Sequence, residues 1–108
     1  MSGLFGTSGI RRKFTEFPQG FAKDLGAALG SFERVPVAVG RDTRQSGLAL
    51  ESDFVAGLTS TGCNVSLLGV VPTPTVGVAT KDHGVGVVVT ASHNPPEYNG
   101  FKFFDRYG

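Results

Sequence analysis

The sequence predicts an α/β fold in which a mostly parallel, mixed sheet of about four strands lies between two layers of helices. Two short apolar segments, 35–39 and 85–89, are each followed by Gly or polar residues, which is typical of buried parallel strands. Segments with apolar residues at three- and four-residue steps precede and separate these strands. Because such helices bury one face each, they are expected to cover both faces of the sheet, as a three-layer α/β/α arrangement.

The first helix and the first strand follow an N-terminal arm. Apolar residues recur at helical spacing from Phe17 to Phe32, which predicts a helix with one apolar stripe. The strand at 35–39 comes next. A second helix is predicted around Leu50 to Leu58, with Ser46 near its start.

The second half of the chain contains the weaker signals. Residues 64–68 form a possible strand, and Thr73 followed by Pro74 fits an N-cap with proline at the first position of a short helix. That helix is expected to end near Thr80. After the strand at 85–89, the turn dipeptide at 99–100 predicts a last strand over 101–104.

Composition restricts the classes of protein that need to be considered. The 108 residues, of which 40% are hydrophobic and 18% charged, suit one small folded domain. A net charge of +1 argues against a nucleic-acid binder. The sequence shows neither an apolar run of about 18 residues nor a signal-peptide pattern, so no membrane partner is expected. The single Cys fits a reducing compartment, and we expect the cytoplasm.

The loop after the strand at 85–89 carries the residues best suited to chemistry. Ser92 could act as a nucleophile or carry a phosphoryl group, and His93 could transfer a proton or contact phosphate. Two prolines that follow Asn94 would stiffen the loop. The alternative is a polar turn in which Ser92 and Asn94 bond the backbone.

A second candidate anion site lies near the N-terminus. Thr7 and Ser8 stand in a Gly-rich segment that leads into Arg11 and Arg12, and such segments suit phosphate binding. The segment fits neither of the common nucleotide-binding glycine patterns. The alternative is an N-terminal arm whose two arginines are solvated.

Two further groups have both a functional and a structural interpretation. The segment 40–44 could orient an anion, but we favour an Arg–Asp ion pair that closes the loop. Lys102 alternates with Phe101 and Phe103, so it should point to the opposite face of the sheet. There it could reach a phosphate near Ser92 or simply face solvent. Carboxylates at metal-ligand spacing are not found, so a complete metal site within this chain is not expected.

Four segments resemble one enzyme superfamily in the same order. Residues 90–102 are similar to the phosphoserine signature of the α-D-phosphohexomutases, which include phosphoglucomutase, phosphomannomutase and phosphoglucosamine mutase. Residues 5–11, 39–47 and 69–74 also resemble segments of that superfamily. The resemblance extends over nearly the whole chain and implies that residues 1–108 form an incomplete N-terminal domain I of a four-domain enzyme.

The resemblance implies a role for each candidate residue. Ser92 would be phosphorylated and would exchange its phosphoryl group with a hexose phosphate through a sugar bisphosphate. Arg11 and Lys102 would stabilise the transferring group or assist proton transfer, while His93 and Asn94 would contact the phosphoserine. Many members have Gly at the position of Arg12, so the resemblance leaves open which arginine acts.

The resemblance also implies cofactors, partners and a substrate class. Mg²⁺ would be held mainly by a loop of a missing second domain and would contact Ser92 only through its phosphate. The isolated chain is therefore expected to be inactive without the missing domains. Residues 95–98 favour phosphomannomutase or phosphoglucomutase, whereas 99–104 are closer to phosphoglucosamine mutase. A non-catalytic module that binds an anion or docks a partner is the other alternative.

Overall fold

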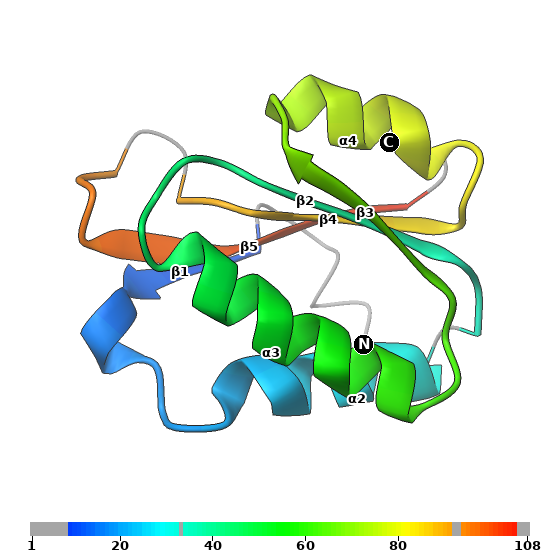
Figure 1. Ribbon diagram of the computed structural model, residues 1–108, viewed down its shortest axis with the longest axis horizontal. Coiled ribbons are helices and arrows are strands. Elements are labelled where there is room, and N and C mark those ends of the chain that lie inside the picture. The colour runs from blue at the N-terminus through cyan, green and yellow to red at the C-terminus, as the bar shows by residue number, and fades with distance from the viewer. Residues whose placement is uncertain (1–8, 33, 92–93, 106–108) are drawn as a thin grey trace.

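The computed structural model describes residues 9–32, 34–91 and 94–105, which form helices on both sides of one central sheet (Figure 1). In chain order the elements are β1 (Ile10–Lys13), the 3-10 helix η1 (Phe14–Glu16), α2 (Phe21–Phe32), β2 (Val37–Arg41), α3 (Gly47–Ser60), β3 (Val65–Val70), α4 (Thr73–Thr80), β4 (Val85–Val89) and β5 (Tyr98–Asp105).

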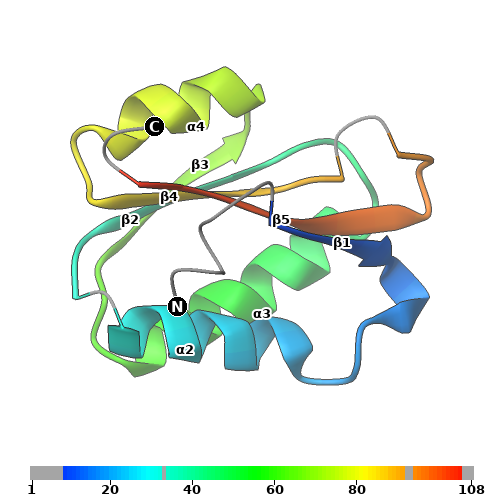
Figure 2. The same ribbon diagram turned by 180° about the vertical axis from the view of Figure 1, so that it is seen from behind.

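The described residues form a five-stranded sheet in the order β1-β5-β4-β2-β3. Strand β2 is parallel to both β3 and β4, while β5 is antiparallel to β4 and to β1. Helices α2 and α3 cover one face and α4 covers the other, as the two opposite views show (Figures 1 and 2). The predicted fold class is therefore confirmed. The strand that the sequence did not predict is β1.

The larger core lies between the sheet and the pair α2 and α3. Phe54 of α3 is fully buried, and its ring centroid lies 5.1 Å from that of Phe101 on β5. Leu29 of α2 and Leu58 of α3 are also fully buried in this core. Because each apolar side chain of this size contributes about 1.5–3 kcal/mol when buried, this layer supplies much of the driving force for folding.

Helices α2 and α3 approach each other so closely that only glycine fits at their contact. A Cβ atom built on Gly57 would lie 2.0 Å from the carbonyl oxygen of Lys23. A Cβ on Gly26 would lie 2.1 Å from the carbonyl oxygen of Phe54. The two glycines therefore permit the close approach of α2 and α3.

The predicted helix from Phe17 begins later than expected. Helix α2 starts at Phe21, because residues 18–20, which include Pro18, form the turn that leads into it. Phe17 still contributes to the apolar face, since its ring stacks on that of Phe21 with centroids 5.2 Å apart. Helix α4 ends at Thr80 as predicted, but its N-cap is Pro72, so Thr73 is already helical.

The dipeptide Asn99-Gly100 does not form a turn. Both residues lie inside β5, where Asn99 pairs with Arg12 and Gly100 with Arg11. A Cβ on Gly100 would lie 1.9 Å from the carbonyl oxygen of Ile10, so the absence of a side chain permits this strand to pair with β1. The close approach of another strand, not a turn, accounts for the glycine.

Candidate active site

The loop between β4 and β5 is closed by main-chain hydrogen bonds. At its base the amide of Thr90 donates to the carbonyl of Gly100 (2.9 Å). Within the loop the Asn94 amide donates to the Ala91 carbonyl (3.1 Å), and the Tyr98 amide donates to the Pro95 carbonyl (3.0 Å). This loop follows the carboxyl end of β4, beside the carboxyl end of β2, which is where parallel α/β sheets bind ligands.

Several predicted site residues lie outside the described part of the chain. These residues are Thr7, Ser8, Ser92 and His93. The structure does describe the residues on both sides of the Ser92-His93 pair. Ala91 is buried, and Asn94 is half-buried in an open cavity of about 540 Å³ that it shares with the loop after β2.

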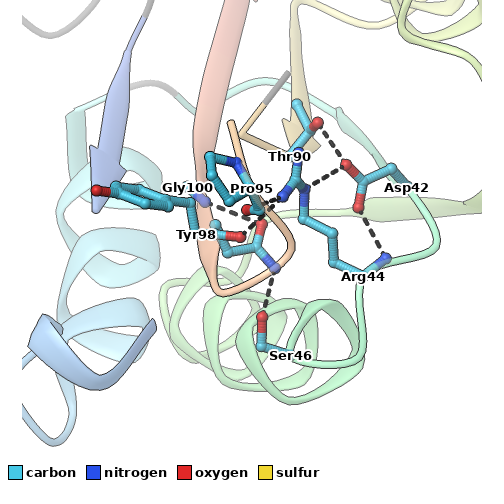
Figure 3. A network of polar contacts seen from close by, with 8 residues as sticks. Asp42, Arg44, Ser46, Thr90, Pro95, Tyr98 and Gly100 are labelled. Carbon is cyan, nitrogen blue, oxygen red and sulfur yellow. Dashed lines mark hydrogen bonds and ion pairs between the residues drawn. The ribbon is translucent and has the colours of Figure 1, made fainter. Parts of the chain in front are cut away.

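An ion pair in the loop after β2 contacts the candidate loop from two directions (Figure 3). The Nε of Arg44 donates to Oδ2 of Asp42 (3.0 Å), which confirms the predicted Arg–Asp pair. The same Oδ2 accepts a hydrogen bond from the Thr90 hydroxyl (2.6 Å). The Nη1 of Arg44 donates to the carbonyl oxygens of Pro95 (2.7 Å) and Tyr98 (3.2 Å).

A second polar contact fixes β5 to the start of α3. Asn99 is fully buried, and its Nδ2 donates to the Ser46 hydroxyl over 2.8 Å (Figure 3). Its Oδ1 accepts the Gly100 amide at 2.9 Å. Ser46 occupies the N-cap position of α3 but makes no capping hydrogen bond with its side chain. Ser46 therefore does not act as a capping side chain and instead accepts a bond from the buried amide of β5.

The two arginines of β1 lie on opposite faces of the sheet. Arg11 pairs with Gly100, so it shares a face with Lys102, which is two residues further along β5. Arg12 pairs with Asn99 and so points to the face that carries Phe101. Both arginines are exposed.

Lys102 occupies the face that its alternation predicts. Phe101 and Phe103 are buried at 1% and 6% exposure, whereas Lys102 is half-buried on the other side of the strand. Its Nζ lies 5.6 Å from the centroid of the Phe104 ring. A cation over an aromatic face gains a modest attraction, which keeps the ammonium beside the strand.

A partly buried ion pair lies at the carboxyl end of β2. The Nε of Arg41 lies 3.6 Å from Oε1 of Glu51 on α3. Burial raises the pKa of Glu51 above its ordinary value of 4.5, and this effect outweighs the opposing attraction to Arg41. The sequence pattern did not indicate this pair, because its members stand on different elements.

The described residues do not supply a metal site of their own. Within the ranges 9–32, 34–91 and 94–105, no group of three or more His, Cys, Asp or Glu side chains could hold a metal ion. The described side chains therefore do not form a Mg²⁺ site by themselves. The described helices also include none that is both long and apolar enough to cross a bilayer.

Comparison with known families identifies the chain. Residues 2–108 match the family model described as phosphoglucomutase/phosphomannomutase, alpha/beta/alpha domain I. The chain belongs to this family. It is thus a member of the α-D-phosphohexomutase superfamily, as the four sequence segments indicate.

Curated relatives carry the name of one branch of this superfamily. A phosphoglucosamine mutase from Methanococcus vannielii is 49% identical over 105 residues, which are 97% of this chain and 23% of the relative. The phosphoglucosamine mutase of Clostridioides difficile is 47% identical over 116 residues, covering 100% of this chain and 26% of the relative. The phosphohexomutase domain therefore spans about a quarter of the curated relatives it matches.

Solved structures of the family have the same fold. A phosphoglucomutase/phosphomannomutase family protein from Burkholderia thailandensis superposes with a TM-score of 0.77 at 35% identity. The match covers 90% of this chain and 24% of that protein. A protein from Thermus thermophilus assigned as a phosphomannomutase gives a TM-score of 0.83 at 36% identity, over 94% of this chain and 25% of that one.

Sequence reasoning did not find the contacts that hold the candidate loop. Arg44 bonds carbonyls that lie 51 and 54 residues away in the sequence. Main-chain carbonyls leave no side-chain signature, so the only available signal was the Asp42-x-Arg44 spacing. That spacing predicted the ion pair but not its partners.

Proposed function

We propose that this chain is the phosphoserine domain of a longer phosphohexomutase, here called the parent enzyme, and that Ser92 carries the phosphoryl group. Family membership and the 90–102 motif support the reaction class. The observation that carries the proposal is the hydrogen-bonded loop at the carboxyl end of β4, because Ser92 lies in the sequence between its described residues Ala91 and Asn94. A compartment with reduced thiols, the cytoplasm, suits the single Cys.

The proposed reaction moves one phosphoryl group in each direction. A hydroxyl oxygen of the bound hexose phosphate attacks the phosphorus on Ser92, a P–O bond to the sugar forms, and the P–O bond to the serine oxygen breaks. The proton of the sugar hydroxyl passes to a base, for which His93 is a candidate and Lys102 is the alternative where it does not serve as a cation, and the freed serine oxygen takes up a proton in return. The bisphosphate then returns its other phosphoryl group to Ser92 by the reverse step, so the enzyme ends as it began.

The described cations suit such a transfer. The transition state of phosphoryl transfer is loose and rich in negative charge, so positioned cations are more useful than a strong base. Arg11 and Lys102 share one face of the β1–β5 pair, which would place two positive charges on the same side of the sheet. When Mg²⁺ is bound by the rest of the parent enzyme, it would neutralise phosphate charge.

Two groups of substrates are consistent with the proposal. The segment 95–98 favours mannose or glucose phosphates, and the solved relatives carry the corresponding family names. The curated relatives at 47–49% identity are named phosphoglucosamine mutases, an observation that favours glucosamine phosphate as the second candidate. Comparing kcat/KM of the parent enzyme for the 6-phosphates of mannose, glucose and glucosamine would separate them.

The decisive experiment removes one oxygen atom. In the parent enzyme, Ser92→Ala should reduce interconversion of the preferred isomers to background, and phosphopeptide mapping should find the phosphoryl group on Ser92 of the wild type. Ser52→Ala, on the exposed side of α3, is the matched control and should retain turnover. Normal turnover by Ser92→Ala would contradict the proposal. Unphosphorylated Ser92, with ligand binding unchanged in Ser92→Ala, would instead indicate a non-catalytic module.

The 108-residue chain by itself is expected to show no mutase turnover. The family resemblance assigns sugar recognition and the metal loop to domains that these residues do not contain. A continuous assay with purified chain and each sugar 6-phosphate tests this expectation. Turnover that co-purifies with the chain would overturn it.

A further inference from the structure

The β4–β5 loop, whose sequence includes Ser92, is fixed through Asp42 at the end that follows β4. Thr90, the first residue after β4, is buried at 6% exposure and donates its hydroxyl hydrogen to Oδ2 of Asp42 at 2.6 Å. The other carboxylate oxygen of Asp42 accepts the amide of Arg44 at 3.1 Å. Hydrogen bonds to an ionised carboxylate are about twice as strong as neutral ones, so this contact holds the end of β4 firmly.

The end of the same loop that leads into β5 is fixed through Arg44. Its Nη1 donates to the carbonyl oxygens of Pro95 (2.7 Å) and Tyr98 (3.2 Å), which flank the end of the loop where β5 begins (Figure 3). The Nε of the same guanidinium donates to Asp42. A single ion pair thus joins the loop's two ends, although both partners stand on a different loop.

The geometry requires arginine at this position. A guanidinium has a rigid fork of N–H donors, so Nε and Nη1 can bond an acid and two carbonyls at fixed angles. A lysine ammonium is a single point on a flexible stem and cannot reproduce that spacing. The Arg44 side chain is only 11% exposed, whereas the Pro95 carbonyl that it bonds lies at an exposed position.

We propose that Asp42 and Arg44 are positioning residues that fix the two ends of the β4–β5 loop for phosphoryl transfer, a role that rests on the proposed function. The pair joins residues Thr90, Pro95 and Tyr98, which bracket Ser92 in the sequence. Phosphoryl transfer depends on alignment of the attacking and leaving oxygens, and a displacement of about 1 Å can cost about a hundredfold in rate. The pair therefore affects the chemical step through the geometry of the loop.

The test compares three conservative variants in the parent enzyme. Arg44→Lys keeps the charge but loses the fork, Thr90→Val keeps the shape but loses the hydroxyl, and Thr90→Ser keeps the hydroxyl. Arg34→Lys is the matched control, because Arg34 is exposed near the opposite ends of the strands. For each protein, kcat, KM and the rate constant of Ser92 phosphorylation by a sugar 1,6-bisphosphate are measured per phosphorylatable site.

The proposal predicts a split between kcat and KM. Arg44→Lys and Thr90→Val should each lower kcat and the Ser92 phosphorylation rate about ten- to a hundredfold, with KM changed less than about threefold. Thr90→Ser should restore most of the rate, and Arg34→Lys should match the wild type. Because counting phosphorylatable sites corrects for unfolded protein, a purely structural role would leave these rates unchanged.

Other results would overturn the proposal. Unchanged rates in both Arg44→Lys and Thr90→Val, or an equal loss in Thr90→Ser, would exclude a positioning role. If Arg44→Lys does not fold, Thr90→Val against Thr90→Ser decides alone. The proposed function is tested separately by Ser92→Ala. If Ser92→Ala is inactive and the Arg44 and Thr90 variants keep their rates, only the positioning role is rejected. If Ser92→Ala is fully active, the proposed function is rejected.

Discussion

Arg41 and Glu51 form an ion pair in which the carboxylate is buried and the arginine is partly exposed. The Nε of Arg41 lies 3.6 Å from Oε1 of Glu51, and Glu51 is only 7% exposed. Neither Arg41 Nε nor the second carboxylate oxygen of Glu51 has a hydrogen-bond partner among the described residues. The attraction between the charges therefore offsets only part of their desolvation, which is why the pKa of Glu51 is raised.

The raised pKa predicts a specific pH dependence of stability. The folded state binds the Glu51 proton more tightly than the unfolded state, so this group contributes stability below about its ordinary pKa of 4.5. That contribution is lost as the pH rises through the raised pKa of the folded protein. Glu51→Gln carries no such proton, so its Tm relative to the wild type should improve as the pH is raised from about 4 to about 7.

Thermal unfolding across that pH range measures the difference. Each unit by which the pKa is raised corresponds to about 1.4 kcal/mol of unfolding free energy. Asp53→Asn on the exposed side of α3 is the control. A Tm difference between Glu51→Gln and wild type that stays constant with pH would contradict the assignment.

The helix contact at Gly57 predicts opposite effects for two Gly-to-Ala substitutions. Gly57→Ala should lower the free energy of unfolding by about 1–3 kcal/mol, because the new Cβ would meet the Lys23 carbonyl oxygen at 2.0 Å. A Cβ on Gly77 in α4 would have no atom within 4 Å apart from its own helix backbone, so Gly77→Ala should stabilise by about 0.4–1 kcal/mol. Urea unfolding of both variants tests the sign. Equal effects would show that the helices can separate at little cost.

The register of β1 predicts which arginine contributes to turnover in the parent enzyme. Arg11 shares a face with Lys102, so Arg11→Gln should lower kcat about a hundredfold, as removal of a single stabilising donor does elsewhere. Arg12 points to the opposite face, and Arg12→Gln should change kcat less than about threefold. Steady-state kinetics of the two variants make the comparison. A larger loss in Arg12→Gln would reverse the assignment.

The bond between Asn99 and Ser46 predicts a measurable coupling. Asn99→Ala should cost about 1–3 kcal/mol, because it removes a buried amide that bonds the start of α3. Ser46→Ala should cost less, and the double variant should fall short of the sum by about 0.5–1.5 kcal/mol. Chemical unfolding of the four proteins gives this coupling. Strict additivity would mean that the 2.8 Å contact contributes nothing to stability.

The sequence was informative where local pattern and tertiary structure agree. The apolar runs at 35–39 and 85–89 predicted β2 and β4, because strands covered on both faces must be apolar almost throughout. Helix α4 was found to within one residue because Pro74 marks the first turn. The family itself was evident from ordered motifs.

The elements that the sequence pattern did not predict correctly share one physical cause, which is that long-range contacts determine them. Strand β1 has one apolar residue among its four, and it is extended because it pairs with β5. Asn99-Gly100 is a good turn by local preference, but a buried bond to Ser46 and the approach of Ile10 override that preference. Ser92 and His93 lie outside the described residues, so their predicted roles stay predictions.

The two edge strands of the sheet differ strongly in charge and in exposed apolar surface. At one border β1 presents Arg11, Arg12 and Lys13, whose charges repel a second sheet that approaches edge to edge. At the other border β3 has no charged residue, and Leu67 and Val70 are 60% and 51% exposed. When the isolated chain is concentrated, we expect aggregation to start at β3, and a lysine in place of Leu67 to delay it.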